Sequence, residues 1–282
     1  MYLKRILLIV VIFTLTACNR STDNTDNGVI GRYSIGVVSY GKSDTSLKQY
    51  ADFKNYLGSE LKSSIEFEPV YNEVRALKQI SRKKWDLVFA PPGLAAIAIS
   101  RYNYEPILPL EGGDKSRSVL VVKQDSQLEE RQDLAGKVIA LGQKGSATGY
   151  YLPLYNLYGL NFKEILYAPT PQKILQWLDE EKVAGGALSL AEYNLYRRDF
   201  SPNTFKVIYI DQHPVPPGAI LISDRIERNQ EAQIIVKLVN TPSSIAASAG
   251  FLPNEKLPDY SYSIQVIKRV QEISETPAMG VK

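Results

Sequence analysis

The sequence predicts an α/β protein of two lobes, each built on a mostly parallel sheet that is flanked by helices. Short apolar runs with the character of strands alternate with segments whose apolar residues recur at a helical period. The alternation starts again after Gly112-Gly113, as a second lobe requires. The body, from about Tyr33 to about Glu275, is long enough for two modest cores.

Residues 1–17 have the pattern of a secretory signal. Lys4 and Arg5 precede an apolar run from Ile6 to Leu15, which is too short to span a bilayer core of roughly 30 Å. Small residues then lead to Cys18, the only cysteine, in an order that resembles the bacterial lipobox. The resemblance implies that Cys18 becomes the lipidated first residue. The alternative is an ordinary signal peptide with a cysteine there by chance.

A polar segment, residues 18–31, separates this signal from the body. It is rich in Asn, Asp, Ser, Thr and Gly and cannot bury enough apolar surface to fold by itself. We therefore expect a flexible tether. No later segment has 18 consecutive apolar residues, so the sequence predicts no second membrane element.

The first half of the body reads as strands alternating with helices. Ser46 is the expected cap of the first helix, and Pro91-Pro92-Gly93 ends the most apolar strand in a turn. The expected order is strand 33–38, helix 46–61, strand 65–70, helix 74–80, strand 86–90, helix 94–100 and strand 106–110.

The second half repeats the alternation. A glycine-rich loop follows its second strand, and Gly159 is the expected stop of the helix after that loop. The expected order is strands 118–122 and 138–141, a helix to 158, a helix around 174–178, strand 185–188, helix 191–198, strands 205–210 and 219–222, and two closing helices.

Three loops follow apolar strands and precede helices, where parallel sheets bind ligands. They are 39–41, 90–93 and 142–149, and the strongest signal is the run from Gly145 to Tyr150. The first N–H groups of a helix lack internal partners, the helix dipole is positive there, and glycine lets the backbone approach a ligand. With the hydroxyls of Ser146 and Thr148, this loop suits an oxyanion. The alternative is that Ser146 or Thr148 only caps the helix.

Other classes of function find little support. A formal net charge of +3 without a long basic run argues against a nucleic-acid surface. The single histidine, His213, precedes Pro214 in a loop, and there is no nucleophile elbow, phosphate-binding P-loop or dinucleotide motif. No His/Cys cluster has the spacing of a transition-metal site. The sequence therefore predicts no catalytic residue, metal or cofactor.

Five markers in a fixed order give the body a family resemblance. The body resembles the solute-binding components of ABC importers for phosphonate, phosphite and phosphate, within the periplasmic binding proteins of type 2. The glycine-rich marker is the most specific, since that family typically has a Ser-x-Ser-Gly-Tyr run with proline soon after. The markers are Ile35 to Tyr40, Asp86 to Pro91, Arg117 to Val122, Asp133 to Val138 and Gly145 to Pro153.

The resemblance implies two lobes joined by a two-strand hinge, with the ligand between them. Lobe I would comprise residues 32–116 and 217–282, and lobe II residues 117–216. Backbone N–H groups with the hydroxyls of Ser146 and Thr148 would hold the ligand, and Tyr40 would contribute from the facing lobe. The candidate ligand-binding residues are Ser39, Tyr40, Pro91, Pro92, Gly93, Gly145, Ser146, Ala147, Thr148, Gly149, Tyr150, Thr170 and Ser189.

The implied role is a monomeric, lipid-anchored binding protein outside the cytoplasmic membrane, with an ABC permease as its partner. Three departures concern ligand choice. Pro92-Gly93 stands where the family often has a tyrosine, Val183-Ala184-Gly185-Gly186 stands where Val-Asp-Ala-Gly is common, and a histidine near Pro169-Thr170-Pro171 is absent. The alternatives are therefore a diverged binding protein or a sensor for another small solute and, least favoured, a hydrolase.

Overall fold

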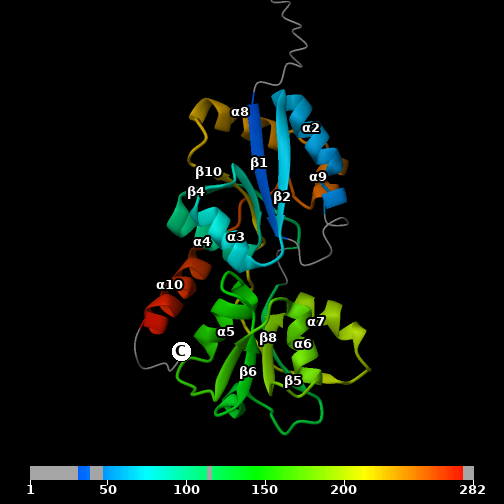
Figure 1. Ribbon diagram of the computed structural model, residues 1–282, viewed down its shortest axis with the longest axis vertical. Coiled ribbons are helices and arrows are strands. Elements are labelled where there is room, and N and C mark those ends of the chain that lie inside the picture. The colour runs from blue at the N-terminus through cyan, green and yellow to red at the C-terminus, as the bar shows by residue number, and fades with distance from the viewer. Residues whose placement is uncertain (1–30, 39–46, 113–115, 276–282) are drawn as a thin grey trace, which may run out of the picture.

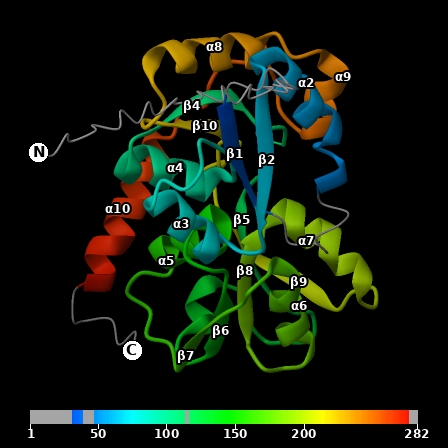
Figure 2. The ribbon, with the colours of Figure 1, turned by 45° about the horizontal axis from the view of Figure 1, so that its top comes forward.

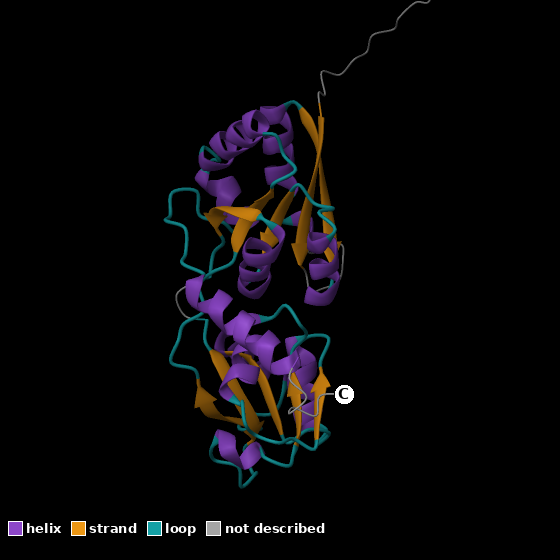
Figure 3. Cartoon of the chain, turned by 90° about the vertical axis from the view of Figure 1, so that its left-hand side faces the viewer, coloured by secondary structure: helices purple, strands orange, loops and turns teal. Residues whose placement is uncertain are grey.

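The computed structural model describes residues 31–38, 47–112 and 116–275. They form two five-stranded sheets, one in each of two lobes that lie one above the other (Figures 1 and 3). The first sheet has the order β2-β1-β3-β10-β4 and the second the order β7-β6-β8-β5-β9. The strands are β1 (Gly31–Val38), β2 (Ser63–Val70), β3 (Leu87–Ala90), β4 (Tyr104–Pro109), β5 (Ser118–Lys123), β6 (Val138–Leu141), β7 (Glu164–Tyr167), β8 (Gly185–Ser189), β9 (Phe205–Ile210) and β10 (Ala219–Ser223).

Each sheet is mixed, because one strand runs against the other four. β10 pairs antiparallel with β3 and β4, and β5 pairs antiparallel with β8 and β9. β5 and β10 are the first strands that the chain forms after it passes from one lobe to the other. Each therefore starts at the end of its sheet that faces the other lobe and runs away from it. The remaining pairs, such as β1 with β3 and β6 with β8, are parallel, as expected.

Helices cover the sheets in both lobes. Between β6 and β7 the chain forms a π-helical turn, η2, that continues directly into α5. The helices of the first lobe are α2 (Ala51–Leu61), α3 (Glu73–Ser81), α4 (Pro92–Tyr102), α8 (Arg228–Val239) and α9 (Ser243–Ala249), and those of the second are η1 (Arg131–Leu134), η2 (Ala147–Tyr151), α5 (Leu152–Asn156), α6 (Pro171–Asp179), α7 (Leu190–Tyr196) and η3 (Arg197–Asp199).

The last described helix, α10 (Ser261–Glu275), lies against both lobes. It contacts α4 on one side and η2 and α5 on the other, and Figures 1 and 2 show it beside α4 and α5. Val266, Ile267 and Val270 of α10 are buried in the core cluster that contains Leu94 and Tyr151. The assignment of residues 217–282 to lobe I alone therefore stays a prediction.

Two chain segments connect the lobes, one between β4 and β5 and one between β9 and β10. They run side by side at Ser116 and Val215, which form an antiparallel bridge with a hydrogen bond of 2.7 Å from the Val215 N–H to the Ser116 carbonyl. This pair is the two-strand hinge that the resemblance implied.

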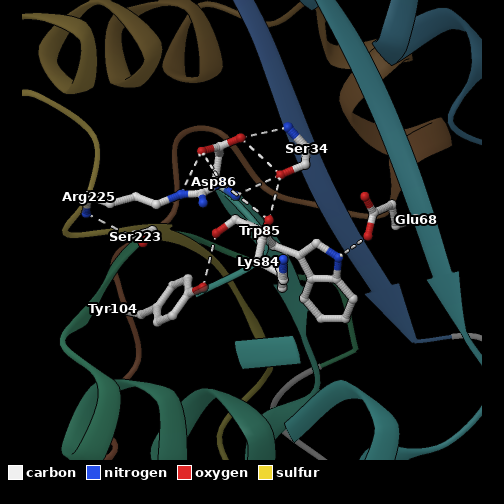
Figure 4. Close-up of polar contacts among 8 residues, drawn as sticks. All are labelled: Ser34, Glu68, Lys84, Trp85, Asp86, Tyr104, Ser223 and Arg225. Carbon is white, nitrogen blue, oxygen red and sulfur yellow. Dashed lines mark hydrogen bonds and ion pairs between the residues drawn. The ribbon is translucent and has the colours of Figure 1, made fainter. Parts of the chain in front are cut away.

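Polar contacts fix the start of β3 (Figure 4). The Asp86 carboxylate accepts hydrogen bonds from the backbone N–H of Ser34, at 2.7 Å, and from the Arg225 guanidinium, at 2.7 and 3.1 Å. The neighbouring Trp85 donates from its indole to Glu68 at 2.8 Å. Because β3 is short and fully buried, fixing its start also fixes where its carboxyl end delivers Pro91.

Several elements differ from the sequence expectation. β7 was not predicted, because its two outer residues are exposed, its two inner residues are only half-buried, and the four show no alternation. Three described helices follow β10 instead of two, since the short, Ala-rich α9 stands between α8 and α10. The helix after the glycine-rich loop begins as a π-helical turn, and the expected cap Ser46 lies outside the described residues.

Candidate functional site

The carboxyl ends of the parallel strands in the two lobes face each other, and two adjoining cavities lie there. The first is a narrow space lined by Glu73, Gly142, Gln143, Ser146, Gly149, Ala168, Pro169, Thr170, Pro171, Ile174, Ala187, Leu188 and Glu192. The second has a volume of about 120 Å³ and is lined by Glu73, Pro91, Pro92, Gly93, Ser116, Gly145, Ser146, Ala147, Thr148, Ser189 and Glu192. Glu73, Ser146 and Glu192 belong to both walls.

The glycine-rich loop after β6 is fixed by its own hydrogen bonds. The Gly142 N–H donates to the Gly149 carbonyl at 2.7 Å, and the Ser146 hydroxyl oxygen accepts from the Gly149 N–H at 3.0 Å. From β5, the Ser118 hydroxyl donates to the Thr148 carbonyl at 2.6 Å. The N–H groups of Ala147 and Thr148 belong to the first turn of the helix, where no intrahelical acceptor exists. The loop is therefore held in place while these donors lie at the cavity wall.

Helix N-termini from both lobes meet at the two cavities. The first lobe supplies Glu73 at the start of α3 and Pro92 at the start of α4. The second supplies the N-cap residues Ser146 of η2, Thr170 of α6 and Ser189 of α7. Each helix N-terminus carries partial positive charge, so their convergence favours an anion. Among the residues that the structure describes, no Lys or Arg lines either cavity.

Two carboxyl groups also face this space. Glu73 is buried at the start of α3. Glu192 forms a capping box with Ser189, whose N–H donates to its Oε2 at 2.8 Å. Burial raises the pKa of the Glu192 carboxyl above its ordinary value, although the hydrogen bonds from Ser189 oppose the shift. This shift favours the protonated, uncharged form of the Glu192 carboxyl relative to a free glutamate.

The structure brings most of the predicted site residues together. Pro91, Pro92, Gly93, Gly145, Ala147, Thr148 and Ser189 line the second cavity, Gly149 and Thr170 line the first, and Ser146 lines both. Tyr150 is on neither wall: its ring packs against Tyr151, at 4.9 Å between centroids, and against Tyr167, at 5.7 Å. Ser39, Tyr40 and Cys18 lie outside the described residues.

Sequence reasoning missed Glu73, Glu192 and Gln143. A usable signal existed, because Glu73 follows the carboxyl end of β2 and Ser189-x-x-Glu192 follows that of β8. Ligands bind beyond the carboxyl ends of parallel strands, so the loops after β2 and β8 are as favourable as the three loops named from the sequence. The Gln143 Oε1 is buried at the first cavity and has no hydrogen-bond partner among the described residues.

Two features are absent from the residues that the structure describes. Within them, no three His, Cys, Asp or Glu side chains are placed to hold a metal ion. Among the same residues, no helix combines the length and the apolar character needed to cross a membrane.

Solved structures share this fold. A Xanthomonas citri protein bound to ATP has a TM-score of 0.71 at 17% identity, covering 86% of this chain and 98% of that one. A phosphonate transporter binding protein of Pseudomonas aeruginosa has a TM-score of 0.67 at 12% identity, covering 89% and 91%. A Prochlorococcus marinus protein in complex with methylphosphonate has a TM-score of 0.66 at 17% identity, covering 87% and 99%.

The sequence itself assigns the family. No curated protein matches the chain. The family model of the periplasmic substrate-binding protein of phosphonate ABC transporters matches residues 35–252, which is more than half of the chain. That family consists of extracytoplasmic transport components and not of enzymes. The chain therefore belongs to the phosphonate family of periplasmic substrate-binding proteins, as its fold and its interlobe cavities lead one to expect.

Proposed function

We propose that the protein binds a small oxyanion of the phosphonate, phosphite or phosphate class between its lobes and delivers it to a membrane permease. The observation that carries this proposal is the convergence of helix N-termini from both lobes on two adjoining cavities. The dipoles and the free N–H donors of helix N-termini favour a bound anion. The methylphosphonate bound to the Prochlorococcus protein supports the ligand class.

Ser146 can cap the helix and donate a hydrogen bond to a ligand at the same time. Its hydroxyl oxygen accepts from the Gly149 N–H, which is the capping role. A hydroxyl also has one hydrogen to donate, and Ser146 lies on both cavity walls. We expect this hydrogen to point to the ligand, beside the N–H groups of Ala147 and Thr148.

Calorimetric titration of wild type and Ser146→Ala tests this proposal, with phosphate, phosphite, methylphosphonate, sulfate and ATP as ligands. A hydrogen bond to a charged group is worth about 1.5–3 kcal/mol, so Ser146→Ala should weaken binding by roughly ten- to more than a hundredfold. The backbone donors survive, so binding should not vanish. ATP should not bind, because the larger cavity is only about 120 Å³.

Asn72→Ala is the matched control. Asn72 caps α3 by accepting from the Arg75 N–H at 2.9 Å, but it lines neither cavity. Both variants should lose about 1 kcal/mol of unfolding free energy through the lost cap. Only Ser146→Ala should lose affinity. A wild type that binds none of the four small oxyanions at millimolar concentration would refute the proposal.

The proposal includes a lipid anchor on Cys18, which the lipobox-like sequence supports. Replacing Cys18 by Ser removes the attachment point for acyl chains. We therefore expect Cys18→Ser to move the protein from the membrane fraction to the soluble fraction, as followed by immunoblot. A variant that stays with membranes through carbonate washing would exclude the anchor.

A further inference from the structure

The lobes touch at Gly93, and only glycine allows the contact. Gly93 lies in the first turn of α4, facing the glycine-rich loop of the other lobe. A Cβ at Gly93 would lie 2.1 Å from the Gly145 carbonyl oxygen and 2.6 Å from the Ala147 nitrogen, closer than the 3.0 Å that real Cβ atoms respect. Both are backbone atoms, which cannot turn aside as a side chain can. Any larger residue would therefore hold the lobes further apart.

The contact between the lobes also leaves no room for a side chain at Gly145. Gly145 has a φ of +119°, and a Cβ there would lie 2.6 Å from the Glu73 Cβ and 3.1 Å from the Leu94 Cδ2. Glu73 and Leu94 belong to α3 and α4 of the first lobe. Two glycines, one from each lobe, thus let the backbones meet directly.

This contact forms part of the wall of the larger cavity. Gly93 and Gly145 both line it, with Pro91 on one side and Thr148 on the other. Its volume of about 120 Å³ is well below the roughly 300 Å³ at which pockets for drug-sized ligands begin. How far the lobes close therefore decides how large an enclosed ligand can be.

We infer that Gly93 and Gly145 form the stop that sets the closest approach of the lobes and so restrict the ligand to a small oxyanion with at most a short substituent. The inference rests on the proposed function and adds a size limit to it. Gly93 acts here as a specificity-determining residue, because its missing side chain brings α4 against the loop that carries the anion donors.

Gly93→Ala tests the size limit with phosphite, methylphosphonate, ethylphosphonate and phenylphosphonate as calorimetric ligands. Wild type should bind methylphosphonate at least about tenfold more tightly than phenylphosphonate. In Gly93→Ala the lobes can close only until the new Cβ is at van der Waals distance from the Gly145 carbonyl oxygen. This difference should then shrink to less than about threefold, mainly through weaker methylphosphonate binding.

Small-angle scattering gives a second readout. Saturating methylphosphonate should reduce the radius of gyration less in Gly93→Ala than in wild type. Gly31→Ala is the control for an added methyl group, because a Cβ there meets only the Ser63 hydroxyl, at 3.4 Å, far from the cleft. It should behave as wild type in both measurements.

These measurements distinguish a failure of the size limit from a failure of the proposed function. A wild type that binds no member of the series contradicts the proposed function, and the size limit falls with it. A wild type that binds methylphosphonate, together with a Gly93→Ala that has the same size profile and the same compaction, overturns the inference alone. Should Gly93→Ala not fold, wild type still decides, because equal affinity for methyl- and phenylphosphonate also overturns it.

Discussion

Three side chains at the cavity walls are both helix caps and candidate ligand contacts. Ser146, Thr170 and Ser189 each cap a helix through the hydroxyl oxygen, and each lies on a cavity wall. Sequence patterns cannot separate a cap from a ligand contact, because both need a short polar side chain at a helix start. Position separates them: Ser146, Thr170 and Ser189 line the cavities, whereas the cap Asn72 lines neither.

Glu192 leads to a prediction about pH. Its pKa is raised in the folded protein by burial, so the protonated form contributes stability that is lost as the pH rises through the folded pKa. Glu192→Gln resembles the protonated form, does not titrate, and keeps an oxygen to accept from the Ser189 N–H. The free energy of unfolding of Glu192→Gln, relative to wild type, should therefore increase as the pH rises above the unfolded glutamate value of about 4.3.

Denaturant unfolding at several pH values measures this difference. Glu105→Gln is the control, since it removes the same charge from an exposed position on β4. A stability difference between Glu192→Gln and wild type that does not change between about pH 4 and pH 8 would contradict a raised pKa of the Glu192 carboxyl.

Strands with fully buried, apolar residues were predictable from sequence. β3 reads Leu-Val-Phe-Ala and is buried at every position, and β10 is likewise buried throughout. β7 was missed because it is a short, half-exposed strand that owes its place to pairing with β6, a tertiary contact that no local pattern records. The π-helical turn of η2 was missed for a related reason, since its extra residue serves the loop geometry and leaves no periodic signal.

Individual helix N-termini were predictable from the sequence, but their convergence on one site between the lobes was not. The glycine-rich loop identified one N-terminus at the site from sequence alone. Thr170 and Ser189, which cap α6 and α7, were also candidates, whereas Glu73 at the start of α3 was not. Only the facing of the two sheets brings these N-termini to one place. The same holds for Gly93, whose role depends on a backbone from the other lobe.

At the scale of the molecule, two connections and one helix tie the lobes together. The bridge between Ser116 and Val215 joins the two connections, and the Tyr260 hydroxyl donates to the Pro217 carbonyl at 2.7 Å. α10 begins directly after this contact and packs on α4 and on η2, the two helices whose N-termini face each other at the larger cavity. Hinge, closing helix and ligand loop are thus parts of one contiguous core.

The central claim is that an oxyanion lies between the lobes at the N-terminus of η2. A crystal structure of wild type grown with methylphosphonate tests it most directly. The account predicts phosphonate oxygens within hydrogen-bond distance of the Ala147 and Thr148 N–H groups and the Ser146 hydroxyl, with Gly93 in contact with the loop over the ligand. A structure with methylphosphonate bound away from all three of these residues would contradict it.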